Sequence, residues 1–181
     1  MLRQAVAEEA ARIMAEQGID DFLLASGLDI ALDRREAPIV DLKDVACAHS
    51  SAYVAELQEF MLGVQASGES RSVDPDTRVC PATWQAILRA AGAAVAATDA
   101  VISGSAANAF CAIRPPGHHA TRDAAMGFCF FNNVCIAARR ALDVHGLKRV
   151  AIVDLDVHHG NGTEDIVAND DRILMVSFFQ H

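Results

Sequence analysis

The sequence predicts an α/β fold built around a parallel sheet. Three short apolar runs in the second half of the chain are typical of buried strands, at residues 109–113, 149–156 and 172–178. A helical pattern over residues 131–144 separates the first two runs. Strands that alternate with helices are typical of parallel sheets with right-handed crossovers, because the chain must return over one face before it pairs again.

The first half of the chain is expected to be mainly helical. Residues 2–17 place apolar side chains on one stripe, and Gly18 suits the end of that helix. Two further helices are predicted over residues 51–62 and 81–97. The stretch between them, residues 63–77, is rich in Gly, Ser, Asp and Pro and is typical of a surface loop.

The composition indicates one globular domain and excludes two classes of partner. The chain has 181 residues, of which 52% are hydrophobic and 22% charged, so it can bury a sizeable core. Its formal net charge is -9 and it has no run of Lys or Arg, so we expect no nucleic-acid partner. The least charged stretch, residues 90–108, is broken by Asp99 and glycines, so we expect no membrane span.

The cysteines and the N-terminus bear on the cellular compartment. The chain has five cysteines, an odd number, and none forms a C-x-x-C pair, so a disulfide framework is not expected. The N-terminus mixes acidic with apolar residues and does not match a signal peptide. We therefore expect a reducing, cytoplasmic location.

Acids and histidines crowd the end of the second predicted strand, in the segment DLDVHHGNG. Alternate residues of an extended chain point the same way, so Asp154, Asp156 and His158 share one side. A carboxylate and an imidazole two residues apart can both reach one small cation, and zinc accepts both kinds of ligand. Solvated surface side chains are the simpler alternative. A close pair of carboxylates needs a cation or a proton, which favours a metal site.

Two adjacent histidines lie in the segment RPPGHHA, which follows the first predicted strand. Histidine is the side chain that titrates nearest neutral pH, so His118 and His119 suit general acid–base chemistry. A structural pair of loop histidines is the alternative. Sites in open α/β sheets collect at the carboxyl ends of strands, so we expect this segment and DLDVHHGNG to meet.

The segment GFCFFNN comes next along the chain. Gly127 allows close backbone approach, and Phe128 and Phe130 are candidates to line a narrow apolar channel. We interpret Phe131 as ordinary core packing before a helix. Cys129 has no visible partner and is interpreted as a small buried residue rather than a nucleophile.

Taken together, RPPGHHA, GFCFFNN and VDLDVHHGNGTE resemble the histone deacetylase and acetylpolyamine amidohydrolase superfamily, most of all its class II and bacterial members. The likeness covers residues 23–181 and only the N-terminal part of the family's catalytic domain. Residues 1–22 match none of it and are expected to form an unrelated helix. The resemblance implies an arginase-like, three-layer α/β fold with a parallel sheet, left incomplete here, and a catalytic zinc ion.

The resemblance also implies roles for individual residues. Asp156 and His158 match two of the three zinc ligands, and His118 and His119 match the tandem catalytic histidines. Asp154 matches the acid that holds the first of these histidines. The remaining carried-over residues are the partner of the second histidine, Asn161, two residues of the substrate tunnel, Gly127 and Phe128, and a rim acid that binds substrate backbone, Asp76.

Two of these assignments carry further expectations. A neutral partner such as Asn161 should leave His119 easier to deprotonate than an aspartate would. Asp74 is a close rival of Asp76 for the rim position. The resemblance also implies a structural potassium site, bound partly through backbone carbonyls, at Asp154, Asp156, His158, Ser177 and Phe178.

The implied activity is zinc-dependent hydrolysis of an N-acetyl amide, with acetylated lysine or an acetylated polyamine as substrate. The family supplies its third zinc ligand and an oxyanion-stabilising tyrosine further downstream. This chain ends at His181, and its one tyrosine, Tyr53, lies outside the matching motifs. We therefore expect impaired turnover, since loss of an oxyanion donor can cost about 10²–10³ in rate.

Two alternatives remain open. The chain is either an enzyme or a non-catalytic fragment or binding module that associates with itself or another chain through an open sheet edge. A manganese ureohydrolase of the same fold is a weaker option, and the tandem GHHA loop argues against it.

Overall fold

The computed structural model describes residues 18–75 and 77–180, and the predicted helix over residues 2–17 lies outside them. The chain divides into two compact units after Glu36. The described part of the first unit holds helix α2 (Ile19–Ser26) and a 3-10 turn (Leu28–Ala31). Gly27 ends α2 in the left-handed conformation at φ 71°, which is the usual way for glycine to close a helix.

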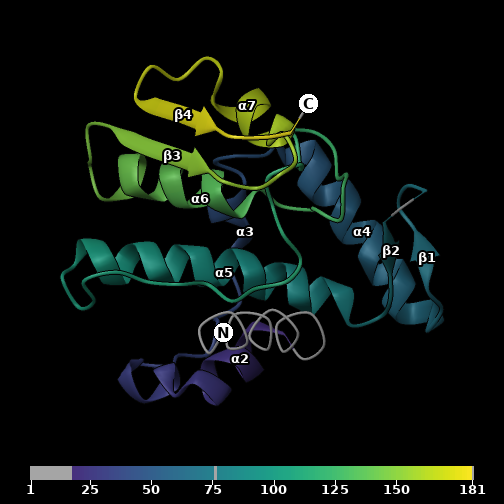
Figure 1. Ribbon diagram of the computed structural model, residues 1–181. Helices are drawn as coiled ribbons and strands as arrows, with labels where there is room; N and C mark the ends of the chain where they lie inside the picture. The colour runs from purple at the N-terminus through teal and green to yellow at the C-terminus, as the bar shows by residue number, and fades with distance from the viewer. Residues whose placement is uncertain (1–17, 76, 181) are drawn as a thin grey trace. The chain divides into compact units, whose positions relative to one another are not determined.

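The second unit holds the remaining elements (Figure 1). Its helices are α3 (Leu42–Val45), α4 (Ser51–Ser67), α5 (Thr83–Ile102), α6 (Asn133–Arg139), which continues as a π-helical turn (Arg140–Val144), and α7 (Asn161–Val167). Its strands are β1 (Arg71–Ser72), β2 (Arg78–Val79), β3 (Val150–Asp154) and β4 (Ile173–Ser177). The predicted helices over residues 51–62, 81–97 and 131–144 are confirmed, although α4 and α5 run further than expected.

Local side chains set the beginnings of two helices. Ser50 accepts a hydrogen bond from the backbone N–H of Tyr53 at the start of α4. Asn132 does the same for Cys135 at the start of α6. Both side chains satisfy a backbone donor that the first turn of a helix cannot pair internally.

Helices α4, α5 and α6 build the apolar core. Buried core residues are Val54, Leu57, Met61 and Val64 from α4, Trp84, Ile87, Leu88 and Ala91 from α5, and Cys135, Ile136 and Ala138 from α6. By length and composition alone, α5 is long and apolar enough to cross a membrane. About a third of this apolar stretch (33%) is buried inside the protein.

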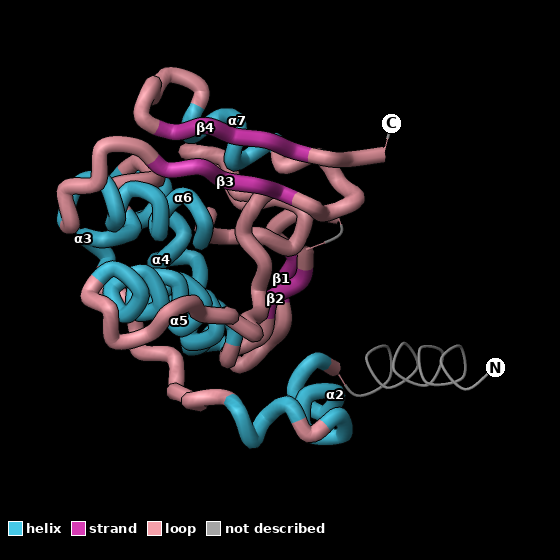
Figure 2. Tube along the Cα trace, turned by 60° about the vertical axis from the view of Figure 1, so that its left-hand side comes forward, coloured by secondary structure: helices cyan, strands magenta, loops and turns pink. Residues whose placement is uncertain are grey.

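Strands β3 and β4 form a parallel pair in which Val150 faces Ile173 and Asp154 faces Ser177 (Figure 2). Helix α7 lies in the connection between them, so the predicted crossover order is confirmed for these two strands. The predicted strand at residues 109–113 is wrong. That segment is irregular and Phe110 is 72% exposed, so the run is neither paired nor buried.

The two faces of the β3–β4 pair differ. Ile152 and Ile173 are buried on the face that meets α6 and α7. On the other face Val153 and Leu174 are about 60% exposed (58% and 62%). The prediction that both strands are fully buried is therefore wrong for one face, and an apolar sheet surface is open to solvent.

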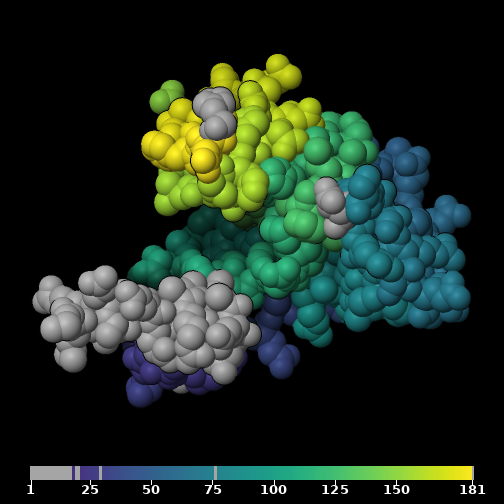
Figure 3. All heavy atoms as spheres, turned by 45° about the vertical axis from the view of Figure 1, so that its right-hand side comes forward, coloured from purple at the N-terminus to yellow at the C-terminus, as the bar shows by residue number. Residues whose placement is uncertain are grey.

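The predicted loop over residues 63–77 is shorter than expected. Helix α4 runs on to Ser67, and β1 and β2 then pair as a short antiparallel ribbon. In Figure 3 the segment around residues 110–130 lies at the surface between this region and the C-terminal strands. That middle segment carries the two adjacent histidines.

Candidate metal and acid–base site

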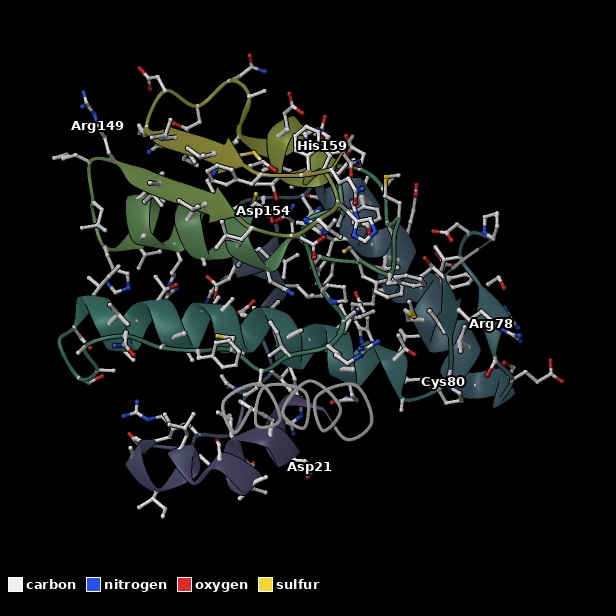
Figure 4. All side chains as sticks on the ribbon, viewed as in Figure 1. Asp21, Arg78, Cys80, Arg149, Asp154 and His159 are labelled. Atoms are coloured by element: carbon white, nitrogen blue, oxygen red, sulfur yellow. The ribbon has the colours of Figure 1, made fainter. Side chains whose placement is uncertain are left out.

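The site lies where the chain leaves the carboxyl end of β3 and turns toward α7. Asp154 ends the strand, and His159 lies in the loop that follows it (Figure 4). Gly160 is required here, because a Cβ atom at that position would lie 2.4 Å from an oxygen of Asp154. The turn therefore brings the α7 loop directly against the acid that ends the strand.

The tandem histidines occupy the adjacent loop, and each has its own partner. His118 donates from Nδ1 to the carboxylate of Asp154 over 2.9 Å, and His119 donates from Nδ1 to the amide oxygen of Asn161 over 2.7 Å. The centroids of the two imidazole rings lie 4.1 Å apart. With Nδ1 engaged in this way, Nε2 of each ring remains free for proton transfer.

Asp156 and His158 form a second pair beside the histidines. Their side chains approach to 2.8 Å between Oδ1 and Nδ1, and the backbone N–H of His158 donates to the same oxygen. This backbone hydrogen bond is the main reason that the pKa of Asp156 is lowered. The His158 ring lies 5.9 Å from the His119 ring, so the pair and the tandem histidines share one site.

The Asp156–His158 pair suits a zinc ion as a partial ligand set. A carboxylate oxygen and an imidazole nitrogen converge there, and zinc accepts both at about 2.0–2.2 Å. Within residues 18–75 and 77–180, no cluster of three or more His, Cys, Asp or Glu side chains is arranged to hold a metal ion.

The residues of the predicted potassium site also lie together. Ser177 faces Asp154 across the β3–β4 pair, and the N–H of Phe178 donates to the carbonyl of Asp154. The hydroxyl of Ser177 is buried and finds no hydrogen-bond partner among the described residues. An orphaned buried oxygen in this position suits a cation that binds through oxygen ligands.

Gly127 and Phe128 lie beside the tandem histidines. Both adopt positive φ, 55° and 65°, and a Cβ atom at Gly127 would come within 2.5 Å of the His119 ring. Phe128 is 57% exposed and its N–H donates to the hydroxyl of Thr77. Together with Phe130 it lines a cavity of about 250 Å³, and neither tandem histidine is among the residues that line this cavity.

Several other residues singled out in the sequence lie outside the histidine and metal pairs. Phe131 and Cys129 are buried, as expected, and burial raises the pKa of the Cys129 thiol. The hydroxyl of Tyr53 is also buried and donates to the carbonyl of Phe130 over 2.7 Å. The predicted rim acid, Asp76, lies outside the described residues, and its rival Asp74 accepts from the N–H of Thr77.

Several contacts of the site have no clear signal in the sequence. Asn161 donates from its amide nitrogen to the sulfur of Met126, and His159 pairs with Glu164 over 2.7 Å. His49 is fully buried and accepts from the N–H of Asn132. The sequence around His49 gives no sign of this contact, which joins residues 83 positions apart.

Residues 7–181 match the model of the histone deacetylase domain. The chain is 41% identical over 162 residues to a histone deacetylase-like amidohydrolase of Pseudomonas aeruginosa, which covers 90% of this chain and 41% of that protein. It is 36% identical over 162 residues to the human polyamine deacetylase HDAC10, covering 89% of this chain and 24% of that protein.

A solved structure agrees with these matches. The crystal structure of the HDA15 HD domain aligns with a TM-score of 0.75 and 33% identity, over 81% of this chain and 41% of that one. The α/β fold is therefore the arginase-like fold of that domain. The chain spans well under half the length of each of these three proteins.

Proposed function

Because the chain belongs to the histone deacetylase family, we propose that its site serves zinc-dependent hydrolysis of N-acetyl amides. The observation that carries the proposal is the pairing of two adjacent histidines with different partners, beside a converging carboxylate and imidazole. Relatives described as polyamine deacetylases support acetylated polyamines as a substrate class, and membership of the histone deacetylase family supports acetylated lysine.

Asp156 and His158 would hold the metal ion in this proposal. When zinc is bound, it polarises the acetyl carbonyl and lowers the pKa of its water. The backbone N–H of His158 keeps the Asp156 carboxylate ionised, and both side chains are largely exposed, at 48% and 69%. They therefore leave room for a substrate carbonyl on their open side.

The two histidines divide the proton transfers. Nδ1 of His119 is engaged by a neutral partner, Asn161, so Nε2 is the ring atom suited to accept a proton from the attacking water. His118 faces the carboxylate of Asp154, which stabilises a positive charge on the ring. It is suited to stabilise the charge that develops in the reaction and to supply a proton to the leaving amine.

Phe128 and Gly127 would guide the substrate. The absent side chain of Gly127 lets the backbone lie against the His119 ring, and the next residue, Phe128, has an exposed aromatic side chain. An aliphatic chain, such as that of acetyl-lysine or an acetylated polyamine, matches such a surface. Its acetyl end would then lie near the histidines.

Acetate release by the purified chain tests this function. We expect hydrolysis of an acetyl-lysine peptide or of an N-acetylated polyamine that requires zinc and is lost in His119→Ala. A parallel reaction adds the remaining portion of the Pseudomonas aeruginosa relative as a separate polypeptide. Equal rates for the chain and His119→Ala, or no zinc-dependent release in either reaction, would reject the proposal.

A second candidate is a non-catalytic module that associates with other chains. It is favoured by the open face of the β3–β4 pair, whose exposed apolar side chains are Val153, Leu155, Leu174, Val176 and Phe178. Parallel strands are normally covered on both faces, so this surface favours association. A chain that is monomeric, cooperatively folded and active by itself would reject this candidate.

A further inference from the structure

A buried amide lies directly behind the tandem histidines. Asn132 is fully buried, and its side chain uses both its acceptor and its donor. Its Oδ1 accepts from the N–H of Cys135 over 3.2 Å, while its Nδ2 donates to the carbonyl of Ala120 over 3.1 Å and to the hydroxyl of Thr163 over 3.2 Å. One side chain therefore joins α6, the histidine loop and α7.

These contacts reach the backbone of both histidines. Ala120 directly follows His119, and the N–H of Thr163 donates to the carbonyl of His118 over 3.0 Å. The two segments pack tightly here, because a Cβ atom at Gly162 would lie 2.3 Å from the Ala120 carbonyl. A change in the position of the Asn132 amide must therefore move the segment that carries the two rings.

Asn132 is itself anchored from the other side. Its N–H donates to Nε2 of His49 over 2.9 Å, and His49 is fully buried against the rings of Tyr53 and Phe131. Burial lowers the pKa of His49 to about 4, so this ring is neutral near pH 7 and Nε2 can accept. The amide thus connects a rigid part of the core to the histidine loop.

A helix cap alone does not explain an asparagine at this position. The cap needs only an oxygen acceptor, and serine or aspartate caps a helix about as well. Asparagine differs from both in that it also donates from an amide, here to Ala120 and Thr163. The donor half of the side chain therefore serves the histidine loop.

We infer that Asn132 is a positioning residue that holds His118 and His119 in register with Asp154 and Asn161. The inference rests on the proposed function for its catalytic consequence. A displacement of the loop by a fraction of an ångström would weaken both ring hydrogen bonds and misplace both free Nε2 atoms. The metal pair, Asp156 and His158, lies on a different loop and would be unaffected.

Two substitutions separate positioning from capping. Asn132→Ser and Asn132→Asp both keep an oxygen that can cap α6, and both lose the amide group that donates to Ala120 and Thr163. We expect each to lower kcat for an acetyl-lysine peptide by about tenfold or more, since small misplacements of reacting groups carry costs of this size. KM and the zinc affinity should stay within about twofold of the unsubstituted chain.

A second measurement does not depend on turnover. The hydrogen-bonded ring N–H protons of His118 and His119 are expected as low-field NMR signals, which Asp154→Asn and Asn161→Ala would assign. Both signals should broaden or vanish in Asn132→Ser and Asn132→Asp. The matched control is Val64→Ala, which truncates a fully buried side chain of α4 and lowers stability without touching the loop.

The inference is overturned if both Asn132 variants fold and keep the ring signals and kcat. It is equally overturned if Val64→Ala loses the signals as well, because the effect is then general destabilisation. Should the unsubstituted chain show no zinc-dependent hydrolysis, the proposed function fails, and the ring signals still decide the role of Asn132.

Discussion

The Nδ1 atom of His119 lies 2.7 Å from the side-chain amide oxygen of Asn161. The neighbouring histidine, His118, pairs instead with a carboxylate, that of Asp154. Two adjacent rings in one loop thus meet partners of different charge. The division of proton transfers that we propose rests on this difference.

Asn161→Asp should make the two histidines alike. The substitution keeps the shape of the side chain and places a carboxylate against His119, which favours the protonated ring. We expect the rising limb of kcat/KM against pH to move to higher pH and the rate at pH 7 to fall. The control is Asn169→Asp, an exposed asparagine outside the site, and superimposable profiles for all three proteins would contradict the assignment.

Asp154→Asn tests the partner of the first histidine. His118 loses an ionised partner, so the ring is held less firmly and a positive charge on it is less stable. We expect acetate release to fall by about 10–100-fold, the range typical of residues that orient a site. Asp171→Asn removes an exposed acid elsewhere and should leave the rate unchanged, so equal effects of the two substitutions would argue against the role.

His49 should make the folded state sensitive to mild acid. Its pKa is lowered by burial from 6.5 to about 4, so between these values the unfolded chain binds a proton that the folded chain does not. Stability should therefore be constant above about pH 7 and fall by up to roughly 3 kcal/mol as the pH drops toward 4.

Urea denaturation at a series of pH values measures this loss. Part of the slope between pH 4 and 6.5 should disappear in His49→Gln, since glutamine does not titrate. Carboxylates such as Asp170, whose pKa is lowered by Arg172, lose their contribution only at more acidic pH. The same slope in His49→Gln and in the unsubstituted chain would show that His49 is not responsible.

The open face of the β3–β4 pair should drive association. Leu174 is 62% exposed on this face, so Leu174→Lys places a charge at its centre. We expect the sedimentation coefficient of the unsubstituted chain to rise with concentration, and that of Leu174→Lys to rise much less. Leu62→Lys alters an exposed leucine of helix α4 and should behave like the unsubstituted chain. A monomer at every concentration would contradict the expectation.

The parts of the fold that follow from local pattern could be predicted. Helical spacing identifies α4 and α5, and the apolar runs identify β3 and β4. The run at residues 109–113 looks the same in sequence but forms no strand in the structure. Periodicity reports apolar character and not the presence of a pairing partner, so such short runs cannot be told apart.

The site shows a similar division. Alternation along an extended chain places Asp154 and Asp156 near one another, and the resemblance suggests which histidine meets which partner. The network behind the site joins His49 to Asn132, which are 83 residues apart, and no local pattern indicates that contact. Burial and long-range hydrogen bonding depend on how the elements pack, which the motifs themselves do not contain.

Zinc binding tests the central claim most directly. Native mass spectrometry of the folded chain after equilibration with zinc should show one ion per chain, and the double variant Asp156→Ala/His158→Ala should lose it. His145→Gln is the control, because this imidazole pairs with Asp99 outside the site. Equal zinc content in the double variant and the unsubstituted chain would contradict the account.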